Sequence, residues 1–409
     1  MGSALWPHEW QDDLREPLFT FQYERTEYGF FFFSVLMWIE ILTFLVIEAC
    51  CAGLLAVAIY YSVLRHQRST LAYVISFGAF LPLCVLTPSP LLDRAGVENI
   101  FMRFCLGGIV PTTSIFRITE AAFGFTPYWA KQSLGQFALY FSSPILLQRD
   151  PKLDKFSPCS LSYLGKRLIK FLTLLFVTGL YQSLFFLLPR VFPKIGSPEG
   201  ETDSEYAYYS LAEAKSPTRW SKSLYFGILF QLYLSVYGEG LMLFTSLGSG
   251  KQTQPVMENP MFESTSASDF WGRRWNLIVH NCLKSGVFKP VRYLGGGKGI
   301  AVLASFMASG LFHEWILQTI SGDERVTPWA TTGFFVWQAM LVSIEDMLGK
   351  NEALLTCGTS VPRPFRTACV VLCGIPLAHW FLGFYVQSKF FVVGGTSLPM
   401  ILPVADTSV

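Results

Sequence analysis

GIAVLASFMASGLFHEWILQTI, residues 299–320, is the stretch that decides the fold class of this 409-residue chain. A run of about 20 mainly apolar residues is long enough to cross a lipid bilayer as a helix. Its most polar side chains are His313, Glu314 and Gln318. An ionisable group at membrane depth costs roughly 2.5 kcal/mol or more, so such groups usually face a partner or a polar cavity and serve function. The stretch therefore predicts a membrane span whose histidine either belongs to a functional site or serves only as a hydrogen-bonding residue between helices.

Apolar runs of similar length recur along the whole chain. Hydrophobic residues make up 51% of the sequence and charged residues 15%, against about 25% charged residues in an average soluble domain. The segment 101–123 is ambiguous because it contains Arg103, Arg117 and Glu120. The composition predicts an all-α, polytopic transmembrane helical protein with eight or nine spans. The eight clear runs cover about 30–63, 70–88, 129–147, 168–189, 223–248, 299–320, 330–348 and 366–388.

The runs divide the chain into a non-membrane segment, two groups of membrane helices, a long loop and a tail. The N-terminal segment lacks the features of a signal peptide, so we expect the first run to act as an uncleaved anchor. Lys and Arg in two of the polar loops favour a cytoplasmic location for both, namely 148–167 and 249–298. The expected divisions are 1–29, 30–248 with polar loops 148–167 and 190–222, 249–298, 299–388 and the C-terminal tail 389–409.

The charge and the cysteines of the chain exclude two other classes of site. A net charge of +2 gives no footprint for a nucleic-acid partner. The nine cysteines lie mostly in apolar runs and show no zinc-ligand spacing, so we interpret them as packing residues. The sequence therefore predicts no metal site.

The segment 264–298 differs from ordinary loop sequence. Ser266 and Asp269 fit a capping box at the start of a helix. In the helix expected to follow, Trp271 and Trp275 recur on one face and Arg273, Asn276 and His280 on another. Such an amphipathic helix lies in the membrane interface. It is either a peripheral anchor or a lid that turns Asn276 and His280 towards a polar cavity.

The two ionisable residues of the span 299–320 are neighbours in sequence but point in different directions. Successive residues on a helix are about 100° apart, so Glu314 is not a direct partner of His313. We expect Glu314, whose helical neighbours are Gly310 and Gln318, to fix this helix against another element. Ser309 and Gly310, behind His313, leave room for a substrate or for a closely packed helix.

Three blocks of this region resemble one known family. The stretch from Asn259 to Asn276, which includes FWGRRWN (270–276), is similar to the signature of wax synthase-like enzymes in the membrane-bound O-acyltransferase (MBOAT) superfamily. FKP (288–290) and GLFHE (310–314) also resemble that family, in the same order. The match covers about 259–320, whereas residues 1–250 share only the pattern of spans.

The resemblance implies an MBOAT-like core and an acyl-CoA-dependent O-acyltransferase. The family's histidine maps to His313 and its asparagine to Asn276, so 299–388 contains the catalytic helices and 249–298 the acyl-donor loop. The acyl-donor residues expected from this comparison are Phe270, Trp271, Arg273, Arg274, Trp275 and His280, with Glu314, Ser309 and Gln318 as supporting residues. The expected reaction is direct transfer, with His313 as the general base on an alcohol hydroxyl and Asn276 either positioning the thioester or stabilising its developing oxyanion.

The expected partners are acyl-CoA as a co-substrate, a lipophilic alcohol and membrane lipids, with no cofactor. A long-chain fatty alcohol would give a wax ester, and diacylglycerol, a sterol or a terpenoid alcohol are alternatives. A lipid or ion transporter is the alternative from another class, since buried acids also serve as ion paths. Neutral-lipid synthesis suggests the endoplasmic reticulum, and the sequence leaves a homo-oligomer open.

Overall fold

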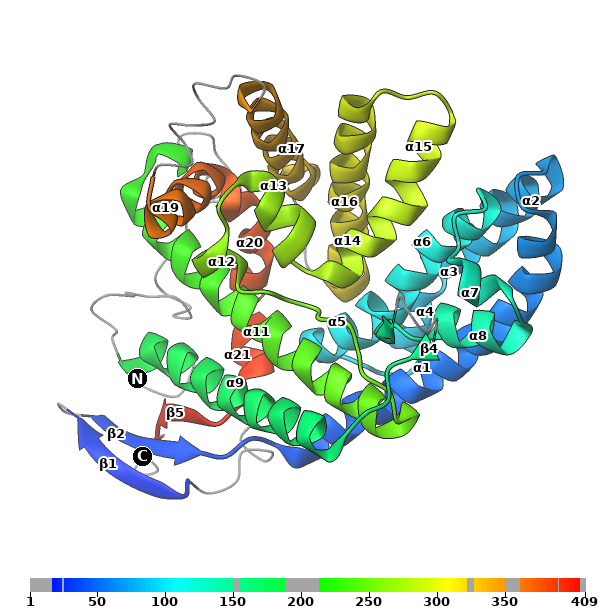
Figure 1. The fold of residues 1–409 in the computed structure, drawn as a ribbon. Coiled ribbons are helices and arrows are strands. Elements are labelled where there is room, and N and C mark those ends of the chain that lie inside the picture. Colours follow the sequence, from blue (N-terminus) through cyan, green and yellow to red (C-terminus); the bar gives the residue numbers. More distant parts are fainter. Residues whose placement is uncertain are drawn as a thin grey trace.

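The chain, described here from a computed structural model, is a bundle of helices with a three-stranded sheet at its edge and a separate two-stranded hairpin (Figure 1). This confirms the all-α class. The description covers residues 17–23, 26–150, 155–187, 213–321, 327–349, 361–388 and 390–404. Most of the predicted N-terminal segment 1–29 and most of the loop 190–222 therefore lie outside the described residues. The longest helices are α1 (Val35–Ser62), α9 (Leu161–Leu187), α11 (Pro217–Ser249), α16 (Lys298–Ser321) and α17 (Ala330–Leu348).

Six helical segments of the described chain are long and apolar enough to cross a membrane. They correspond to six of the eight predicted runs, so the polytopic membrane class is confirmed, with six candidate spans among the described residues. The segments are Val35–His66, Thr70–Arg94, Leu161–Phe185, Pro217–Ser249, Lys298–Ser321 and Arg363–Gln387.

Two predicted spans and the ambiguous segment differ from those six. The span predicted at 129–147 is wrong, because these residues form the short helices α7 (Tyr128–Lys131) and α8 (Leu134–Ser142). Residues 330–348 do form α17, but its Thr, Gln and acidic residues make it more polar than the six segments. Residues 101–123 form α5 (Ile100–Gly108) and α6 (Val110–Ala122), whose charged side chains are buried inside the molecule.

The remaining helices are short, but two continuous runs of them, Thr70–Arg94 and Arg363–Gln387, are among the six candidate membrane segments. Those before α9 are η2 (Leu64–His66), α2 (Thr70–Ile75), η3 (Ser76–Phe80), α3 (Leu81–Leu86) and α4 (Pro88–Arg94). Those between α9 and α16 are η4 (Glu213–Lys215), α12 (Pro260–Glu263), α13 (Ala267–Asp269), η5 (Phe270–Arg274), α14 (Leu277–Leu283), η6 (Lys284–Phe288) and α15 (Lys289–Tyr293). Those after α17 are α19 (Arg363–Gly374), η7 (Ile375–Leu377), α20 (Ala378–Gln387) and α21 (Phe390–Gly395).

Local capping explains where the long helices begin and end. The Ser34 hydroxyl accepts a hydrogen bond from the Met37 N–H at 3.2 Å and starts α1. Pro217 occupies the first turn of α11, where its missing N–H is harmless. The same helix ends at Gly250, whose φ of 64° is in the left-handed region that glycine adopts readily.

The small sheet joins segments from the two ends of the described chain. Strand β2 (Thr26–Phe31) lies between β1 (Phe19–Tyr23) and β5 (Met400–Pro403), and both pairings are antiparallel. β5 also packs against α9, where the Ser183 hydroxyl accepts from the Ile401 N–H at 2.8 Å. The predicted tail 389–409 thus contains a packed helix and a strand.

The predicted polar loops 148–167 and 249–298 contact each other. A two-stranded hairpin of β3 (Arg149–Asp150) and β4 (Lys155–Phe156) lies in the first loop. Isolated antiparallel bridges pair Leu147 with Thr253 and Pro158 with Lys251. The two loops are therefore on the same side of the molecule, as their predicted shared compartment requires.

Inside the bundle the helices are joined by aromatic packing and by buried acids such as Glu239. Phe230 on α11 contacts Tyr385 on α20 with ring centroids 4.9 Å apart. Glu239 on α11 is 1% exposed and accepts from Arg167 at 2.7 Å and Lys170 at 3.0 Å, both on α9. Its carboxylate therefore fixes α9 against α11.

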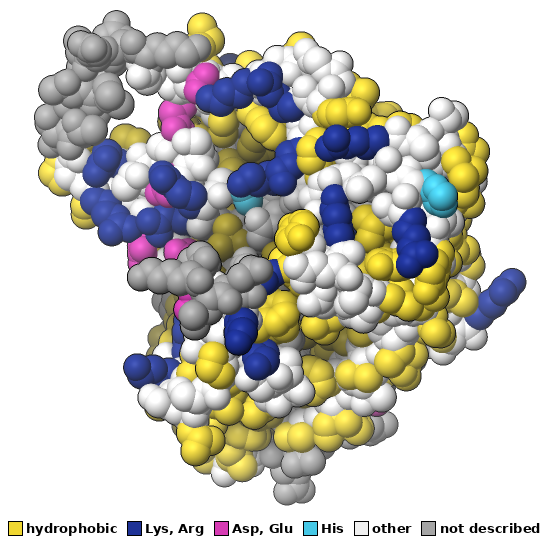
Figure 2. Space-filling view, turned by 45° about the vertical axis from the view of Figure 1, so that its right-hand side comes forward, with side chains coloured by type: hydrophobic (Ala, Val, Ile, Leu, Met, Phe, Trp, Pro, Cys, Tyr) yellow, Lys and Arg dark blue, Asp and Glu magenta, His cyan; other side chains and the backbone are white. Residues whose placement is uncertain are grey.

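The outer surface is rich in apolar side chains. On α1, Leu54 is 74% exposed, and Leu36, Ile39 and Ile47 are also exposed. Figure 2 shows hydrophobic side chains over much of one view, with Lys and Arg gathered towards its upper part. Lipid is the natural solvent for such exposed apolar helix faces.

Candidate active site

His313 lies on α16 within a group of aromatic rings. Its imidazole stacks on Phe335 of α17, with centroids 4.7 Å apart, and meets Phe381 of α20 edge-on at 5.4 Å. Phe312, its neighbour in sequence, lies 5.0 Å away. Phe335 covers one face of the imidazole, and the other two rings restrict its orientation.

One hydrogen bond determines which nitrogen of His313 carries the proton. Nδ1 lies 2.6 Å from the backbone carbonyl oxygen of Ser309, one helical turn earlier. A carbonyl oxygen only accepts, so in the neutral ring Nδ1 is the donor and Nε2 keeps its lone pair. Ser309, a predicted supporting residue, thus acts through its backbone. The arrangement leaves Nε2 able to take a proton.

Glu314 lies against the start of α17. Its Oε1 accepts from the backbone N–H of Thr332 at 3.0 Å. Gly310, one turn earlier, packs so closely that a Cβ there would lie 2.6 Å from the Thr332 Cα. Gln318 is exposed. A share of Glu314 or Gln318 in catalysis stays a prediction.

The single amphipathic helix predicted after Ser266 is wrong. The Ser266 cap is confirmed, because its hydroxyl accepts from the Asp269 N–H at 3.0 Å, but the Asp269 carboxylate accepts from the Thr265 N–H, one residue before the position that a capping box requires. The helix then passes from α13 into the wider π-helical turn η5 and ends at Trp275, which is extended. Asn276 follows with a φ of 36°, in the left-handed region, and caps α14 by accepting from the Val279 N–H at 3.3 Å. This break rotates α14 relative to the tryptophans.

An ion network holds η5 in place. Asp269 is 4% exposed and accepts from Arg273 at 2.9 Å and Arg274 at 3.0 Å. Arg274 also pairs with Glu263 at 2.9 Å, and Arg363 of α19 pairs with the same carboxylate at 3.1 Å. Burial alone would raise the pKa of Asp269, but the Thr265 N–H and the two arginines lower it below its ordinary value. Arg274 therefore stabilises the loop through its two ion pairs. The Arg273 side chain is 72% exposed and remains accessible to solvent.

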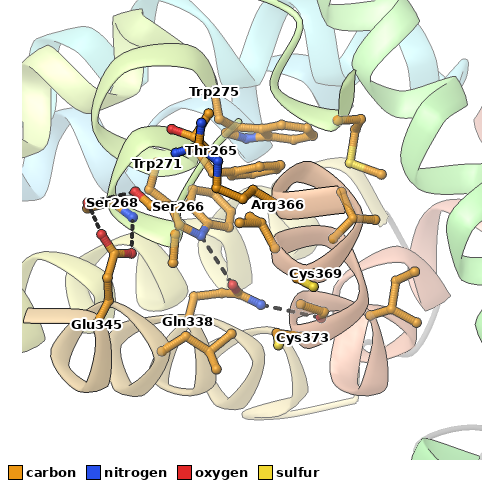
Figure 3. A pocket seen from close by; sticks show the side chains of 18 of the residues that line it. Thr265, Ser266, Ser268, Trp271, Trp275, Gln338, Glu345, Arg366, Cys369 and Cys373 are labelled. Atoms are coloured by element: carbon orange, nitrogen blue, oxygen red, sulfur yellow. Dashed lines mark hydrogen bonds between the residues drawn. The ribbon is translucent and has the colours of Figure 1, made fainter. Parts of the chain in front are cut away.

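A large apolar cavity lies between η5, α17, α19 and α20. Its volume is about 1070 Å³, and Trp271, Trp275, Leu341 and Cys369 are among its lining residues. Figure 3 shows the tryptophans on one side and the cysteines on the other. Polar groups of Ser266, Ser268, Arg273, Glu345 and Arg366 also line it. A polar region beside a long apolar interior suits an amphiphilic ligand.

Two polar residues of α17 hold the cavity wall: Gln338, which sequence reasoning missed, and Glu345, an acid at the edge of an apolar run for which a hydrogen bond to another helix is the expected role. The Trp271 indole N–H donates to Gln338 Oε1 at 3.2 Å, and Gln338 Nε2 donates to the Gly374 carbonyl at 3.4 Å (Figure 3). Glu345 accepts from the backbone N–H of Ser268 at 2.9 Å and from its hydroxyl at 2.5 Å. A glutamine in the middle of the apolar run 330–348 was the available signal for the first of these contacts.

The predicted site residues divide into two groups around this cavity. Phe270, Trp271, Arg273 and Trp275 line it, and His313, Asn276, His280 and Arg274 do not. Phe381 both lines the cavity and touches the His313 ring. One layer of aromatic rings therefore separates the cavity from His313.

Asn276 and His280 belong to α14. No hydrogen bond joins Asn276 to His313 within the described part of the chain. The His280 ring is hydrogen-bonded to the Trp271 backbone. Burial and the nearby charge of Lys284 lower the pKa of His280. It is therefore neutral at pH 7. Among the described residues no three His, Cys, Asp or Glu side chains cluster as metal ligands would.

The fold and the site define a helical membrane protein with a tautomer-fixed histidine beside an apolar cavity. Residues 253–337, which contain both Asn276 and His313, match the model of the membrane bound O-acyl transferase family. The family resemblance read from the sequence is therefore confirmed over this region.

Three relatives extend the comparison. A probable long-chain-alcohol O-fatty-acyltransferase 9 of Arabidopsis thaliana is 34% identical over 145 residues, which are 33% of this chain and 41% of that protein. The probable long-chain-alcohol O-fatty-acyltransferase 6 of the same plant is 23% identical over 365 residues, 85% of this chain and 93% of the relative. An acyl-CoA–sterol O-acyltransferase 1, also from Arabidopsis thaliana, is 31% identical over 110 residues, covering 25% of this chain and 31% of the relative. The higher identities are thus confined to less than half of each relative.

Proposed function

We propose that this chain is an acyl-CoA-dependent O-acyltransferase that esterifies a lipophilic alcohol, with His313 as the general base. The observation that carries the proposal is the hydrogen bond between His313 Nδ1 and the Ser309 carbonyl. It leaves the lone pair of Nε2 available to accept a proton within a candidate membrane span. The family match over residues 253–337 supports the same reaction class.

The reaction is written as a single transfer in a ternary complex. Nε2 of His313 takes the proton of the alcohol hydroxyl while the alcohol oxygen attacks the thioester carbonyl carbon. The carbon–sulfur bond breaks, and the proton passes from His313 to the departing CoA thiolate. The Asn276 amide N–H stabilises the developing oxyanion, a contribution worth roughly 3 kcal/mol.

The apolar cavity is assigned to the fatty acyl chain of the donor. Four residues of the predicted acyl-donor region line it, and its volume of about 1070 Å³ is at the upper end of the usual range for ligand pockets. Arg273 is exposed beside it and attracts the anionic CoA portion. Substrate binding displaces the aromatic layer of Phe381, so that the thioester reaches His313.

The acceptor we favour is a long-chain fatty alcohol, which gives a wax ester. Two of the relatives described above carry a long-chain-alcohol acyltransferase name. A sterol is the second candidate, since a third relative is named for that acceptor. We place the reaction in the endoplasmic reticulum, where both substrates are membrane lipids or bind at the membrane surface.

The test is expression in a host that lacks neutral-lipid synthesis, fed separately with a fatty alcohol, a sterol and diacylglycerol. We expect wax esters after alcohol feeding with the unmodified chain. His313→Ala should lower ester formation by about 10²- to 10⁴-fold, the usual contribution of a general base. His66→Ala, which changes an exposed histidine, is the matched control and should stay active.

Two results separate the parts of the proposal. Ester formation by His313→Ala at the wild-type rate would remove the general-base role and leave the acyltransferase class standing. Failure of the folded wild-type protein to consume acyl-CoA with any of the three acceptors would contradict the function itself.

A further inference from the structure

A second cavity lies between α6, α8 and the α14–η6 segment, apart from the apolar one. Its volume is about 220 Å³, enough for a small polar group and too small for a long acyl chain. Arg117, Lys284 and Lys289 line it together with the polar side chains of Asn281 and Ser285. Among its lining residues, all of which the structure describes, none is acidic. The cavity is therefore electropositive and polar.

Arg117 is fixed inside this cavity. Its side chain is buried, with 3% of the residue exposed. Nη1 donates to the carbonyl oxygens of Phe141 at 3.1 Å and Ser143 at 2.7 Å, and the guanidinium lies 4.4 Å from the centroid of the Tyr140 ring. Nε is buried and has no hydrogen-bond partner among the described residues. A buried, unsatisfied guanidinium N–H is rare in a folded protein and requires an explanation.

The nearest acid does not neutralise the site. Glu120, one turn from Arg117, is 2% exposed. It accepts the Tyr140 hydroxyl at 2.9 Å on both carboxylate oxygens and also interacts with Ser285. Arg117 and Lys289 both interact electrostatically with this carboxylate, whereas Lys284 remains exposed. A net positive charge is left for a ligand.

We propose that this cavity binds a phosphate group. A planar guanidinium and two ammonium groups are the usual partners of phosphate oxygens, and the charge of a phosphate balances the excess. The group is supplied by a phospholipid headgroup or by coenzyme A, which share this chemistry.

A phosphate bound in this cavity would hold α14 against α6. Asn281, Lys284 and Ser285 are three and four residues apart, so they share one face at the end of α14 and the start of η6. A phosphate held between them and Arg117 ties α14 to α6. Asn276 caps the other end of α14, so its position depends on the same tie.

Native mass spectrometry of the purified full chain in detergent tests the proposal at low ionic strength. The probes are dioleoyl phosphatidic acid, coenzyme A and inorganic phosphate, each added alone. Dioleoylglycerol, which has the same chains without phosphate, is the neutral reference. The double variant Lys284→Gln/Lys289→Gln should bind a phosphate-bearing probe about tenfold more weakly than the wild type, since each charged hydrogen bond contributes to the affinity.

A matched control and a second variant guard against misfolding. Lys155→Gln changes an exposed lysine on β4 that does not line the cavity, and should leave binding unchanged. Lys284→Gln alone removes an exposed charge, and its thermal unfolding should match that of the wild type. A weaker binding by this single variant is expected as well.

The outcomes identify the source of the phosphate. A loss confined to phosphatidic acid supports a lipid headgroup, and a loss for coenzyme A supports the co-substrate. The proposal would be overturned if the double variant bound each of the three phosphate probes as tightly as the wild type does. It would also be overturned if the double variant lost as much affinity for dioleoylglycerol as for the phosphate probes. Binding is read without turnover, so failure here is distinct from failure of the proposed acyltransferase.

Discussion

The Oδ1 atom of Asn276 accepts a hydrogen bond from the backbone N–H of Val279 and so starts α14. One side chain oxygen thus serves the fold, while the amide N–H₂ of the same residue is assigned to the thioester. The two roles of Asn276 require different atoms and can be separated by mutation.

Asn276→Asp keeps the capping oxygen and removes the amide donor. We expect its kcat to fall by about 10²- to 10³-fold, the usual loss for one oxyanion donor, with an unchanged melting temperature. Asn276→Ala should in addition lower stability by about 1 kcal/mol through the lost cap. Steady-state kinetics and thermal unfolding of both variants check this. An active Asn276→Asp would restrict Asn276 to its capping role.

Asp269 gives the loop that holds the tryptophans a pH-dependent stability. Its pKa is lower in the folded chain than the ordinary value of 3.8, so its contribution is present above that value and is lost as pH falls through the folded pKa. Asp269→Asn should lower the free energy of unfolding at pH 7 by about 1–3 kcal/mol, because Arg274 loses a buried partner. The difference in free energy of unfolding between the wild type and Asp269→Asn should be smaller at pH 3 than at pH 7. Glu258→Gln, an exposed acid in the same segment, should show no such difference at either pH.

Leu341 lines the apolar cavity from α17 and offers a test of chain length. Leu341→Trp fills part of the space, so the ratio of kcat/KM for a 16-carbon over an 8-carbon acyl-CoA should fall about tenfold. Met340→Trp places the same side chain at the next position, which is 49% exposed and does not line the cavity. A similar fall in both variants would show that the cavity does not hold the acyl chain.

Two glycines of α16 differ in the space around them. A Cβ on Gly310 would lie 2.6 Å from the Thr332 Cα, while a Cβ on Gly299 would have no atom within 4 Å. Gly310→Ala should therefore separate α16 from α17 and destabilise the protein by about 1–3 kcal/mol. Gly299→Ala should be neutral or stabilising by up to about 1 kcal/mol. Melting temperatures in the same detergent measure both, and equal values would contradict the close packing.

The apolar runs predicted the bundle because span length depends on local composition alone. The histidine span, the helix cap at Ser266 and the long helices could all be read in this way. The sheet could not, since β5 pairs with a strand far away in sequence and neither strand has a distinctive pattern beside the long runs.

The broken helix at Asn276 shows a different limit. Trp271, Trp275, Ile278 and Cys282 keep helical spacing across the break, so periodicity alone indicated one continuous helix. The left-handed backbone at Asn276 and the wider turn η5 leave no trace in that pattern. The cavities were equally hidden, because their walls come from helices that are remote in sequence. Family resemblance selected His313 and Asn276, but only the folded chain shows that Gln338 holds Trp271 and that Arg117 lines the second cavity together with residues of α14.

The pairing of β2 with β5 restricts the number of times that the chain can cross the membrane. β2 directly precedes the first span and β5 follows the last described helix, yet the two strands share one sheet. Both flanks of the bundle therefore emerge into the same compartment. A chain that enters and leaves on one side crosses an even number of times, so nine crossings are excluded, whereas six or eight satisfy the rule. Glycosylation-reporter tags fused beside β2 and beside β5 should therefore give the same result: both should be glycosylated, or neither should be.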